Sequence, residues 1–185
     1  VIEGLDGSGK STQLELLPKK LLENGINSKT VSFPDYESDS SALVNMYLNG
    51  EFGKKPDDVN AYTASLFYAV DRFASYKTSW GEYYNQGGVI ISNKYTTSNA
   101  VHQTSKMCES GWRSFIDWLY DLEYNKVGIP KPDKVIFLDM PVEVSQKLLS
   151  GRYNGNEAKK DIHESDTEYL AKCRKAAMFT ADYSG

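Results

Sequence analysis

The sequence contains little cysteine and no long apolar run. Its two cysteines, Cys108 and Cys173, lie far apart and outside any CxxC or Cys/His cluster, which argues against a zinc site and against a disulfide framework. We therefore expect a protein of a reducing cytoplasm. Because no run of about eighteen apolar residues occurs, we expect no membrane-spanning helix. Since Val1 falls within a predicted strand, we expect only a few residues to precede it.

The sequence also has no excess of basic over acidic residues. The 21 basic and 25 acidic residues give a net charge of −4, so no global positive field attracts a nucleic-acid polymer, and a polyanionic partner has to be bound locally. At 185 residues and 40% hydrophobic content, the chain is long enough for one well-buried core and short for two. We expect a single domain over residues 1–185.

The sequence does contain a regular alternation of short apolar runs and helix-length segments. Runs rich in β-branched residues predict buried strands at 1–3, 29–33, 88–93 and 134–139. The spacing of apolar and aromatic residues predicts helices at 10–24, 38–49, 57–85, 98–106, 111–126, 141–150 and 163–183. Such alternation is typical of an α/β fold, in which helices cover both faces of a central, mostly parallel sheet and ligands bind at the carboxyl ends of the strands.

The stretch GLDGSGKST, from Gly4 to Thr12, lies between the first predicted strand and the first predicted helix. It satisfies the pattern GxxxxGK[ST], in which backbone N–H groups and a helix N-terminus surround the phosphates of a nucleotide. Lys10 is expected to bridge the β- and γ-phosphates, and Ser11 to ligate Mg²⁺. The expected nucleotide-binding residues are Gly4, Asp6, Gly7, Ser8, Gly9, Lys10, Ser11 and Thr12.

Six segments, this loop among them, resemble in order and spacing those of the thymidylate kinases, which are P-loop nucleoside monophosphate kinases, in a form seen among Gram-positive bacteria. The segments are EGLDGSGKSTQ (3–13), FPDY (33–36), LFYAVDRFAS (66–75), KYTTSNAVHQ (94–103), GIPKPD (128–133) and RYNGN...KKDIHE (152–164). The resemblance implies a three-layer P-loop NTPase fold with a short lid. It also implies transfer of the γ-phosphoryl group of ATP to dTMP, giving dTDP and ADP with Mg²⁺, by a homodimer that pairs through long helices around 57–80.

The resemblance also assigns residues to an acceptor site. Arg72 matches an arginine that grips the phosphate of dTMP, since a guanidinium forks onto phosphate oxygens; from the residues alone, an ion pair with Asp71 or Asp58 is an equal alternative. Tyr68 matches a ring that stacks on thymine. Asp6 matches an acid that accepts a hydrogen bond from the 3′-hydroxyl, its alternative being a solvent-facing loop acid. The expected dTMP site is Asp6, Phe33, Pro34, Tyr68, Arg72, Lys94, Tyr95, Ser98, Asn99 and Gln103.

Polar residues at 98–103 supply the edge of this site. Ser98, Asn99 and Gln103 match a segment that lies along the thymine edge, where side-chain amides offer both donors and acceptors. The alternative for Ser98, or for Thr97, is to cap the N-terminus of a helix. We expect the neighbouring His102 to be structural.

The sequence departs from the family pattern in one acceptor segment. Phe33 and Pro34 match a pair of residues that packs against the acceptor base. Asp35 and Tyr36 follow them, where many relatives place an arginine. This segment therefore lacks the arginine contact to the acceptor that those relatives have.

A second departure lies at 93–95, where the family pattern is Asp-Arg-Tyr or Asp-Arg-His and this chain has Asn-Lys-Tyr. We expect Asn93 to lie on a strand beside the phosphate-loop strand, near the Mg²⁺ site, where it lacks the charge of an aspartate, while Lys94 is a point charge in place of a planar fork. Losing one such contact lowers rates on the order of 10²-fold, although positioning by other groups still supports transfer. Asp139 also follows an apolar strand, but its place before Met140 and Pro141 favours a strand-to-helix turn.

The polar, glycine-bearing stretch at about 150–162 is predicted to form the lid. Arg152, Lys159 and Lys160 are expected to close over the transferring phosphoryl group and to exclude water; a solvated basic loop is the alternative. The expected catalytic residues are Lys10, Asp6, Arg72, Lys94 and Arg152.

Three functions remain open from the sequence. The first is a dTMP kinase, either fully active or attenuated by Asn93 and Lys94. The second is a catalytically silent nucleotide-binding or regulatory homologue, and the third is a kinase for another acceptor, such as dUMP or a deoxynucleoside. The expected partners are the small nucleotides ATP and dTMP, with no nucleic-acid polymer and no membrane. The resemblance places the contacts to adenine beyond Gly185.

Overall fold

The computed structural model describes residues 1–152 and 167–184, without the side chains of 149–152 and Thr167. Most of the predicted lid, with Lys159 and Lys160, therefore lies outside the described residues, and so does the side chain of Arg152.

Four parallel strands form the central sheet of the described chain, in the order β2-β3-β1-β4. They are β1 (Ile2–Glu3), β2 (Ser28–Ser32), β3 (Val89–Asn93) and β4 (Ile136–Phe137). Ile2 pairs with Asn93 on one side and with Ile136 on the other. The carboxyl end of β3 therefore lies beside that of β1, as predicted for the strand that holds Asn93, and the predicted α/β fold is confirmed.

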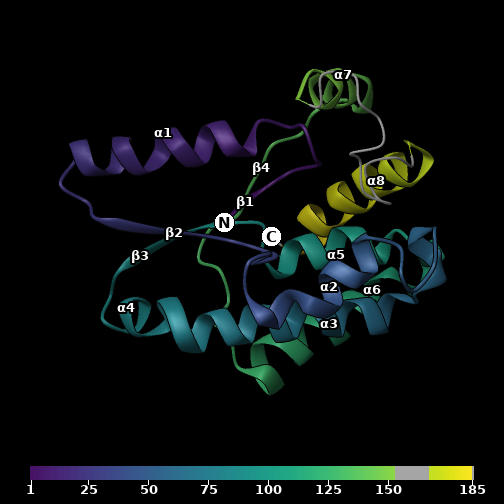
Figure 1. Ribbon diagram of the computed structural model, residues 1–185, viewed down its shortest axis with the longest axis horizontal. Helices are drawn as coiled ribbons and strands as arrows, with labels where there is room; N and C mark the ends of the chain where they lie inside the picture. The colour runs from purple at the N-terminus through teal and green to yellow at the C-terminus, as the bar shows by residue number, and fades with distance from the viewer. Residues whose placement is uncertain (153–166, 185) are drawn as a thin grey trace.

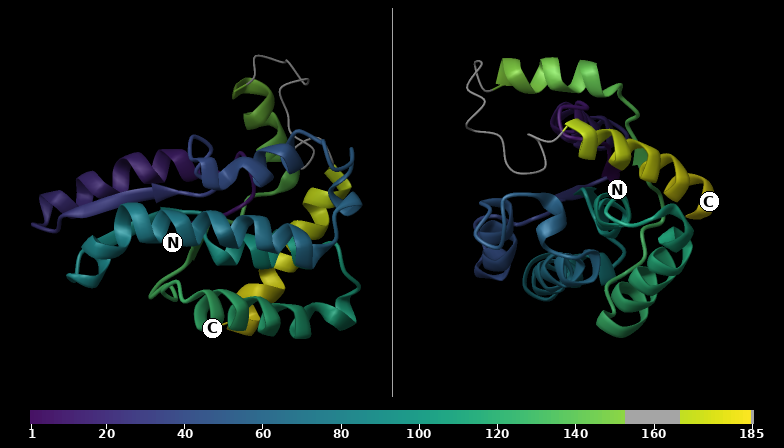
Figure 2. Two further views of the ribbon diagram at one scale, coloured as in Figure 1. Left: turned by 60° about the horizontal axis from the view of Figure 1, so that its bottom comes forward. Right: turned by 90° about the vertical axis from the view of Figure 1, so that its right-hand side faces the viewer.

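Helices lie on both faces of this sheet. Figure 1 shows α1 (Lys10–Glu23) along one face, while α3 (Ala61–Ser75) and α5 (Thr96–Thr104) lie on the other. The right-hand view of Figure 2 separates α1 and α7 from α3 and α6 in the same way. The remaining helical elements are η1 (Asp39–Ser41), α2 (Ala42–Leu48), η2 (Pro56–Asp58), η3 (Tyr76–Trp80), α4 (Gly81–Asn85), η4 (Glu109–Gly111), α6 (Trp112–Tyr120), η5 (Asp121–Val127), α7 (Val142–Arg152) and α8 (Thr167–Ser184).

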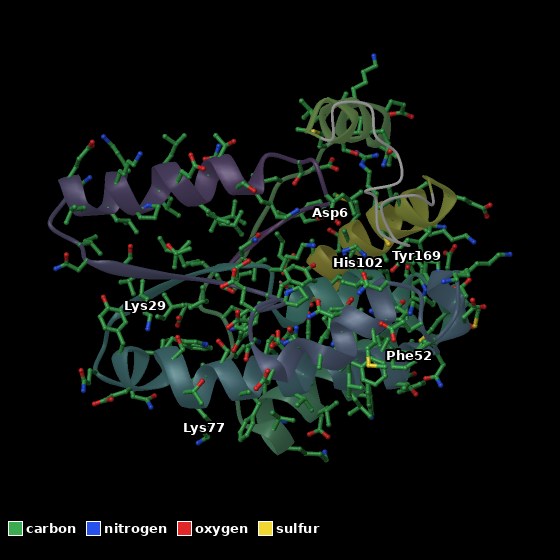
Figure 3. All side chains as sticks on the ribbon, in the orientation of Figure 1. Asp6, Lys29, Phe52, Lys77, His102 and Tyr169 are labelled. Carbon is green, nitrogen blue, oxygen red and sulfur yellow. The ribbon has the colours of Figure 1, made fainter. Side chains whose placement is uncertain are left out.

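The helix predicted at 57–85 begins later and is not uniform. Asn60 caps it, because its side-chain oxygen accepts a hydrogen bond from the backbone N–H of Thr63 at 2.9 Å. The preceding residues form the separate 3₁₀ turn η2, and a π-helical stretch, η3, joins α3 to α4. Lys29 of β2 donates a hydrogen bond to the carbonyl of Ser79 at 2.6 Å, which ties this stretch to the sheet (Figure 3).

The strand predicted at 134–139 is shorter than expected. Only Ile136 and Phe137 are paired as strand, because β4 can pair only with the two residues of β1. The backbone N–H of Leu138 still donates to the carbonyl of Glu3 at 2.8 Å. The sheet edge therefore reaches to the start of the phosphate loop.

Two apolar clusters hold the elements around the carboxyl ends of the strands. The first joins the phosphate loop to α5 and α8, and the second lies beneath the ends of β2 and β3. The first consists of Leu5, Val101, Tyr169, Cys173 and Ala177, and the second of Phe33, Trp80, Tyr95 and Ile129. Since interiors pack at the density of crystals, these clusters fix the loops above them. No helix in the described ranges is long and apolar enough to cross a bilayer.

Candidate functional site

The loop between β1 and α1 forms a cradle for an anion. Gly9 caps α1 in a left-handed conformation, with φ of 89°, and no side chain caps the first turn. Gly4 has φ of 150°, and a Cβ there would lie 2.5 Å from Ser8 Oγ and 2.9 Å from the Leu138 carbonyl oxygen. Glycine is therefore required at Gly4, and the N–H groups at the start of α1 remain open to a ligand.

Lys10 lies inside this loop. Its ammonium group donates to the carbonyl oxygens of Gly4 at 2.7 Å and Leu5 at 2.8 Å, and the side chain is only 7% exposed. Burial lowers the pKa of Lys10 to about 8, against the opposing effect of the Asp6 carboxylate. The charge that would bridge two phosphates is thus held in place before any nucleotide binds.

Asp6 lies between two ammonium groups. Its Oδ1 is 3.0 Å from Lys94 Nζ and 3.7 Å from Lys10 Nζ. Burial alone would raise the pKa of the Asp6 carboxyl, but Lys94 and then Lys10 offset this and hold the pKa well below its ordinary value. Asp6 is therefore an ionised, paired acid, in contrast to the solvent-facing alternative.

An unusual backbone turn brings Lys94 to this position. Its φ of 61° lies in the left-handed region, which no other described residue apart from glycines enters. The N–H of Lys94 donates to the carbonyl of Ile2 at 3.1 Å, and Ser92 Oγ donates to the carbonyl of Lys94 at 2.5 Å. Residues held in this way cluster at functional sites, where the surrounding structure offsets a cost of about 1–3 kcal/mol.

Asn93, just before this turn, ends β3 with a neutral side chain. Its Nδ2 donates to Ser32 Oγ at 2.9 Å, while its Oδ1 is buried without a hydrogen-bond partner among the described residues. A buried acceptor without a partner costs about 1–3 kcal/mol. It is therefore available to a ligand or to a water held by one.

One pocket brings together all ten residues predicted for the acceptor. Figure 3 shows Asp6 and His102 near one another at this place, between the loop and α5. The pocket is lined by Asp6, Phe33, Pro34, Tyr68, Arg72, Lys94, Tyr95, Ser98, Asn99 and Gln103, and also by Tyr36, Leu48 and His102. The last three were not predicted to belong to it. A signal was present for two of them, because Tyr36 closes the FPDY segment and His102 lies one helical turn after Ser98.

Arg72 lies in this pocket but is already paired. It is 2% exposed, and its Nε and Nη2 donate to the two oxygens of Glu123 at 2.7 and 2.5 Å. Although burial alone would lower it, Glu123 raises the pKa of the guanidinium. The ion pair that was the alternative for Arg72 is present, but with Glu123 in place of Asp71 or Asp58. Asp71 accepts from the N–H of Asp35 at 2.9 Å, and Asp58 from that of Lys55 at 3.0 Å.

A second buried glutamate, Glu3, holds the start of α5. Its Oε1 accepts from the N–H of Tyr95 at 3.0 Å and from Thr97 Oγ1 at 2.5 Å, and its Oε2 accepts from Ser98 Oγ at 2.5 Å. The alternative that Ser98 or Thr97 caps the helix does not hold, because α5 begins at Thr96 with Tyr95 at the N-cap position and no side-chain cap. The hydroxyl groups of both residues instead bind the end of β1.

The amides of the pocket retain open hydrogen-bonding capacity. Asn99 Nδ2 donates to Glu123 Oε1 and to the carbonyl of Ser65, both at 3.2 Å. Its Oδ1, and both amide atoms of the fully buried Gln103, have no partner among the described residues. Since buried polar groups are nearly always hydrogen-bonded in a working state, these atoms indicate a polar ligand.

His102 forms part of the wall and also packs against α8. Its Nδ1 lies 3.4 Å from Cys173 Sγ and 3.5 Å from Tyr169 Oη. Burial, and then the positive charge of Lys94, lower the pKa of His102 to about 3. The ring is therefore neutral, which agrees with the structural role expected for it, while its position adds it to the pocket.

Asp139 has the structural role that its sequence position favours. It follows β4 and forms a bidentate ion pair with Arg174 of α8, at 2.7 and 2.8 Å. It therefore does not replace the carboxylate missing at Asn93. Ser11 is exposed in the first turn of α1, and the described residues contain no group of three acids, histidines or cysteines that could hold a metal ion by itself.

Comparisons with known proteins point to one family. The family model described as Thymidylate kinase matches residues 2–184. Thymidylate kinase from Mycobacterium tuberculosis is 29% identical over 169 residues, covering 90% of this chain and 78% of the relative. A probable thymidylate kinase from Thermococcus onnurineus is 30% identical over 156 residues, covering 82% and 71%. The solved structure of thymidylate kinase from Candida albicans matches with a TM-score of 0.72 at 27% identity, over 98% of this chain and 77% of that one.

Proposed function

The chain belongs to the thymidylate kinase family, and we propose that its phosphate loop binds ATP while the pocket beside it binds dTMP. The protein is a kinase that phosphorylates dTMP to dTDP. The observation that carries the assignment of the two sites is the convergence of all ten predicted acceptor residues on one pocket, which shares Asp6 with the loop.

The phosphate end of the pocket carries the charge needed for transfer. Phosphoryl transfer is catalysed mainly by positioning and by stabilising charge on the transferring group. Lys10 and Lys94 lie on either side of Asp6, so their ammonium groups meet where the donor and acceptor phosphates would face each other. We assign Asp6 to the acceptor sugar, because an ionised acid accepts a hydrogen bond from a hydroxyl group.

The loop also suits a magnesium nucleotide. Ser11 supplies an exposed hydroxyl in the first turn of α1, which together with nucleotide phosphates would hold Mg²⁺. The ion supplies positive charge that offsets the charge of the phosphates. Asn93 offers an uncharged oxygen nearby, so the protein contributes less negative charge to the metal than an aspartate would. This supports an attenuated turnover.

The opposite end suits a neutral pyrimidine. Phe33 and Tyr68 supply apolar and aromatic surface, and Asn99 and Gln103 supply amides without full hydrogen bonding. A pyrimidine edge alternates donors and acceptors, which side-chain amides match. Arg72 would contact the acceptor with the N–H groups that Glu123 leaves over.

The surface of α3 supports a homodimer. Tyr62, Leu66, Val70 and Phe73 are each 38–56% exposed and recur every three or four residues, so they share one face of the helix. A C₂ pair of such faces would bury them against one another. The two free cysteines, Cys108 and Cys173, support a reducing compartment, for which we propose the cytoplasm.

A coupled assay of ADP release tests the function. We expect turnover with dTMP that exceeds turnover with dUMP, dCMP or thymidine, and that depends on Mg²⁺. Glu23→Gln serves as the control, since Glu23 pairs with Lys20 on the exposed last turn of α1, at the end of the helix away from the phosphate loop. Intact binding of ATP and dTMP without turnover would indicate the silent homologue. Preference for another acceptor would overturn the assignment of dTMP.

A further inference from the structure

We propose that Glu123 is a positioning residue for the acceptor, which fixes the side chains of Arg72 and Asn99 in the pocket. This inference rests on the proposed function, because it takes the pocket to be the dTMP site. Glu123 does not itself line the pocket. Its effect on the acceptor would therefore pass through the two residues that it holds.

Glu123 makes a complete set of hydrogen bonds. Its side chain is fully buried, and besides the two bonds from Arg72 it accepts from Thr96 Oγ1 at 2.9 Å and from Asn99 Nδ2 at 3.2 Å. An ionised carboxylate offers about four acceptor sites, so none is left for the ligand. One side chain from η5 thus sets the orientation of groups on α3 and α5.

The backbone around Glu123 is built to hold it inward. Glu123 belongs to the π-helical η5, a wider turn of a kind often found at functional sites. Gly128 ends the turn in a left-handed conformation, and the N–H groups of Gly128 and Ile129 both donate to the Glu123 carbonyl, at 3.0 and 3.1 Å. On the same turn, Asp121 faces outward and pairs with Lys126.

The ion pair between Arg72 and Glu123 determines which atoms of Arg72 can contact a ligand. Glu123 occupies Nε and Nη2, which form one edge of the guanidinium, and so directs the Nη1 side to the pocket that Arg72 lines. Likewise, Glu123 binds Asn99 Nδ2 and leaves Oδ1 without a described partner. The pairing also neutralises the charge of Arg72, so in this proposal Arg72 meets the uncharged base, in place of the acceptor phosphate that the resemblance assigned to it.

The test is the Glu123→Gln variant, which keeps the shape of the side chain but removes its charge and half of its acceptors. Because hydrogen bonds to charged groups are worth about 10-fold or more in affinity, we expect the KM for dTMP to rise about 10-fold or more. The kcat should change by less than about 3-fold, and the KM for ATP should not change. Asp121→Asn, on the exposed side of the same turn, is the matched control and should leave all three constants unchanged.

A pair of variants separates positioning from folding. In an Arg72→Gln background, Glu123→Gln should raise the KM for dTMP by a smaller factor than in the wild-type background, since only the effect that passes through Asn99 remains. Arg72→Gln alone leaves the Glu123 carboxylate buried without its cation, whereas the double variant has no uncompensated buried charge. If a single variant fails to fold, the double variant is compared with the wild type, and an unchanged KM for dTMP in it contradicts the proposal. An unchanged KM in folded Glu123→Gln, or an equal rise for ATP and dTMP, or an effect in the Arg72→Gln background as large as in the wild-type background, would overturn the proposal. A wild type that does not use dTMP would instead overturn the proposed function.

Discussion

The ammonium group of Lys94 lies 3.0 Å from Oδ1 of Asp6. One residue follows β3 and the other lies in the loop after β1, so the pairing of adjacent parallel strands makes this contact possible. Asp6 also faces Lys10 at 3.7 Å. The carboxylate therefore holds two cations at the junction of the two sites, and an incoming phosphate has to share them.

The residues at 93 and 94 are expected to limit turnover. Asn93→Asp and Lys94→Arg should each raise kcat with dTMP by about 10-fold, because the first adds a charge near the metal and the second adds a planar fork for phosphate. The effect of Asn93→Asp should be largest at low Mg²⁺. Steady-state kinetics over a range of Mg²⁺ concentrations measure both, with Lys126→Arg as a surface control. A lower kcat in both variants would contradict this prediction and would show that Asn93 and Lys94 do not limit turnover.

Gln103 is expected to lower the free energy of unfolding of the ligand-free protein and to contribute hydrogen bonds to bound dTMP. Both of its amide atoms are buried without described partners, and each such group costs about 1–3 kcal/mol. Gln103→Met should therefore raise the free energy of unfolding by about 1 kcal/mol and raise the KM for dTMP about 10-fold. Thermal melting and kinetics measure the two effects. The exposed Gln13→Met should change neither; a destabilised Gln103→Met would show that Gln103 is already satisfied.

His102 is expected to contribute to acid lability. Its pKa is lowered from 6.5 to about 3 by burial and by Lys94, so between these values the unfolded chain binds a proton that the folded chain does not. The stability that comes from keeping His102 neutral is therefore fully present above pH 6.5, and it is lost as the pH falls towards 3. It should cost on the order of 1–2 kcal/mol between pH 7 and pH 5. In urea titrations, His102→Gln should lose less stability over this range than the wild type. Equal losses of stability in the two proteins would show that His102 does not cause the acid lability.

The apolar face of α3 is expected to hold a second copy. Val70 is 56% exposed on this face, and placing a charge there would leave it buried without a partner in the dimer. Val70→Asp should weaken self-association by about 100-fold or more, as measured by analytical ultracentrifugation. Leu22→Asp, at a similarly exposed leucine of α1, should leave self-association unchanged. If the wild type is a monomer at micromolar concentration, the homodimer proposal fails.

Local chemistry made part of the site predictable. The phosphate loop is contiguous, and the left-handed backbone at Gly4 and Gly9 needs glycine, so the sequence marks it directly. The alternation of strands and helices likewise indicated which loops meet at the carboxyl ends of the sheet. The acceptor residues were predicted by family resemblance, since their joint position depends on how four separate segments pack.

The rest of the site depends on features without a local signal. Glu123 lies within a segment whose periodicity predicts an ordinary helix, and a π-helical turn is not visible in that periodicity. The partner of Arg72 is 51 residues away in sequence, so nearer acids were equally plausible. The left-handed backbone of Lys94 is held by a hydrogen bond to Ile2 of the neighbouring strand and by a local one from Ser92, and side-chain propensity would disfavour it.

The order of strands in the sheet has a consequence for synthesis. Of the four strands, β1 is synthesised first, yet its neighbours are β3 and β4. Both edges of β1 are therefore paired only after Asn93 and then Ile136 have been synthesised. Such non-local pairing slows folding and leaves strand edges exposed in the meantime. The loop that follows β1 can take its ligand-ready shape only when most of the chain has left the ribosome. A truncated chain that ends before β3 should therefore bind no nucleotide, although it contains the whole phosphate-loop motif.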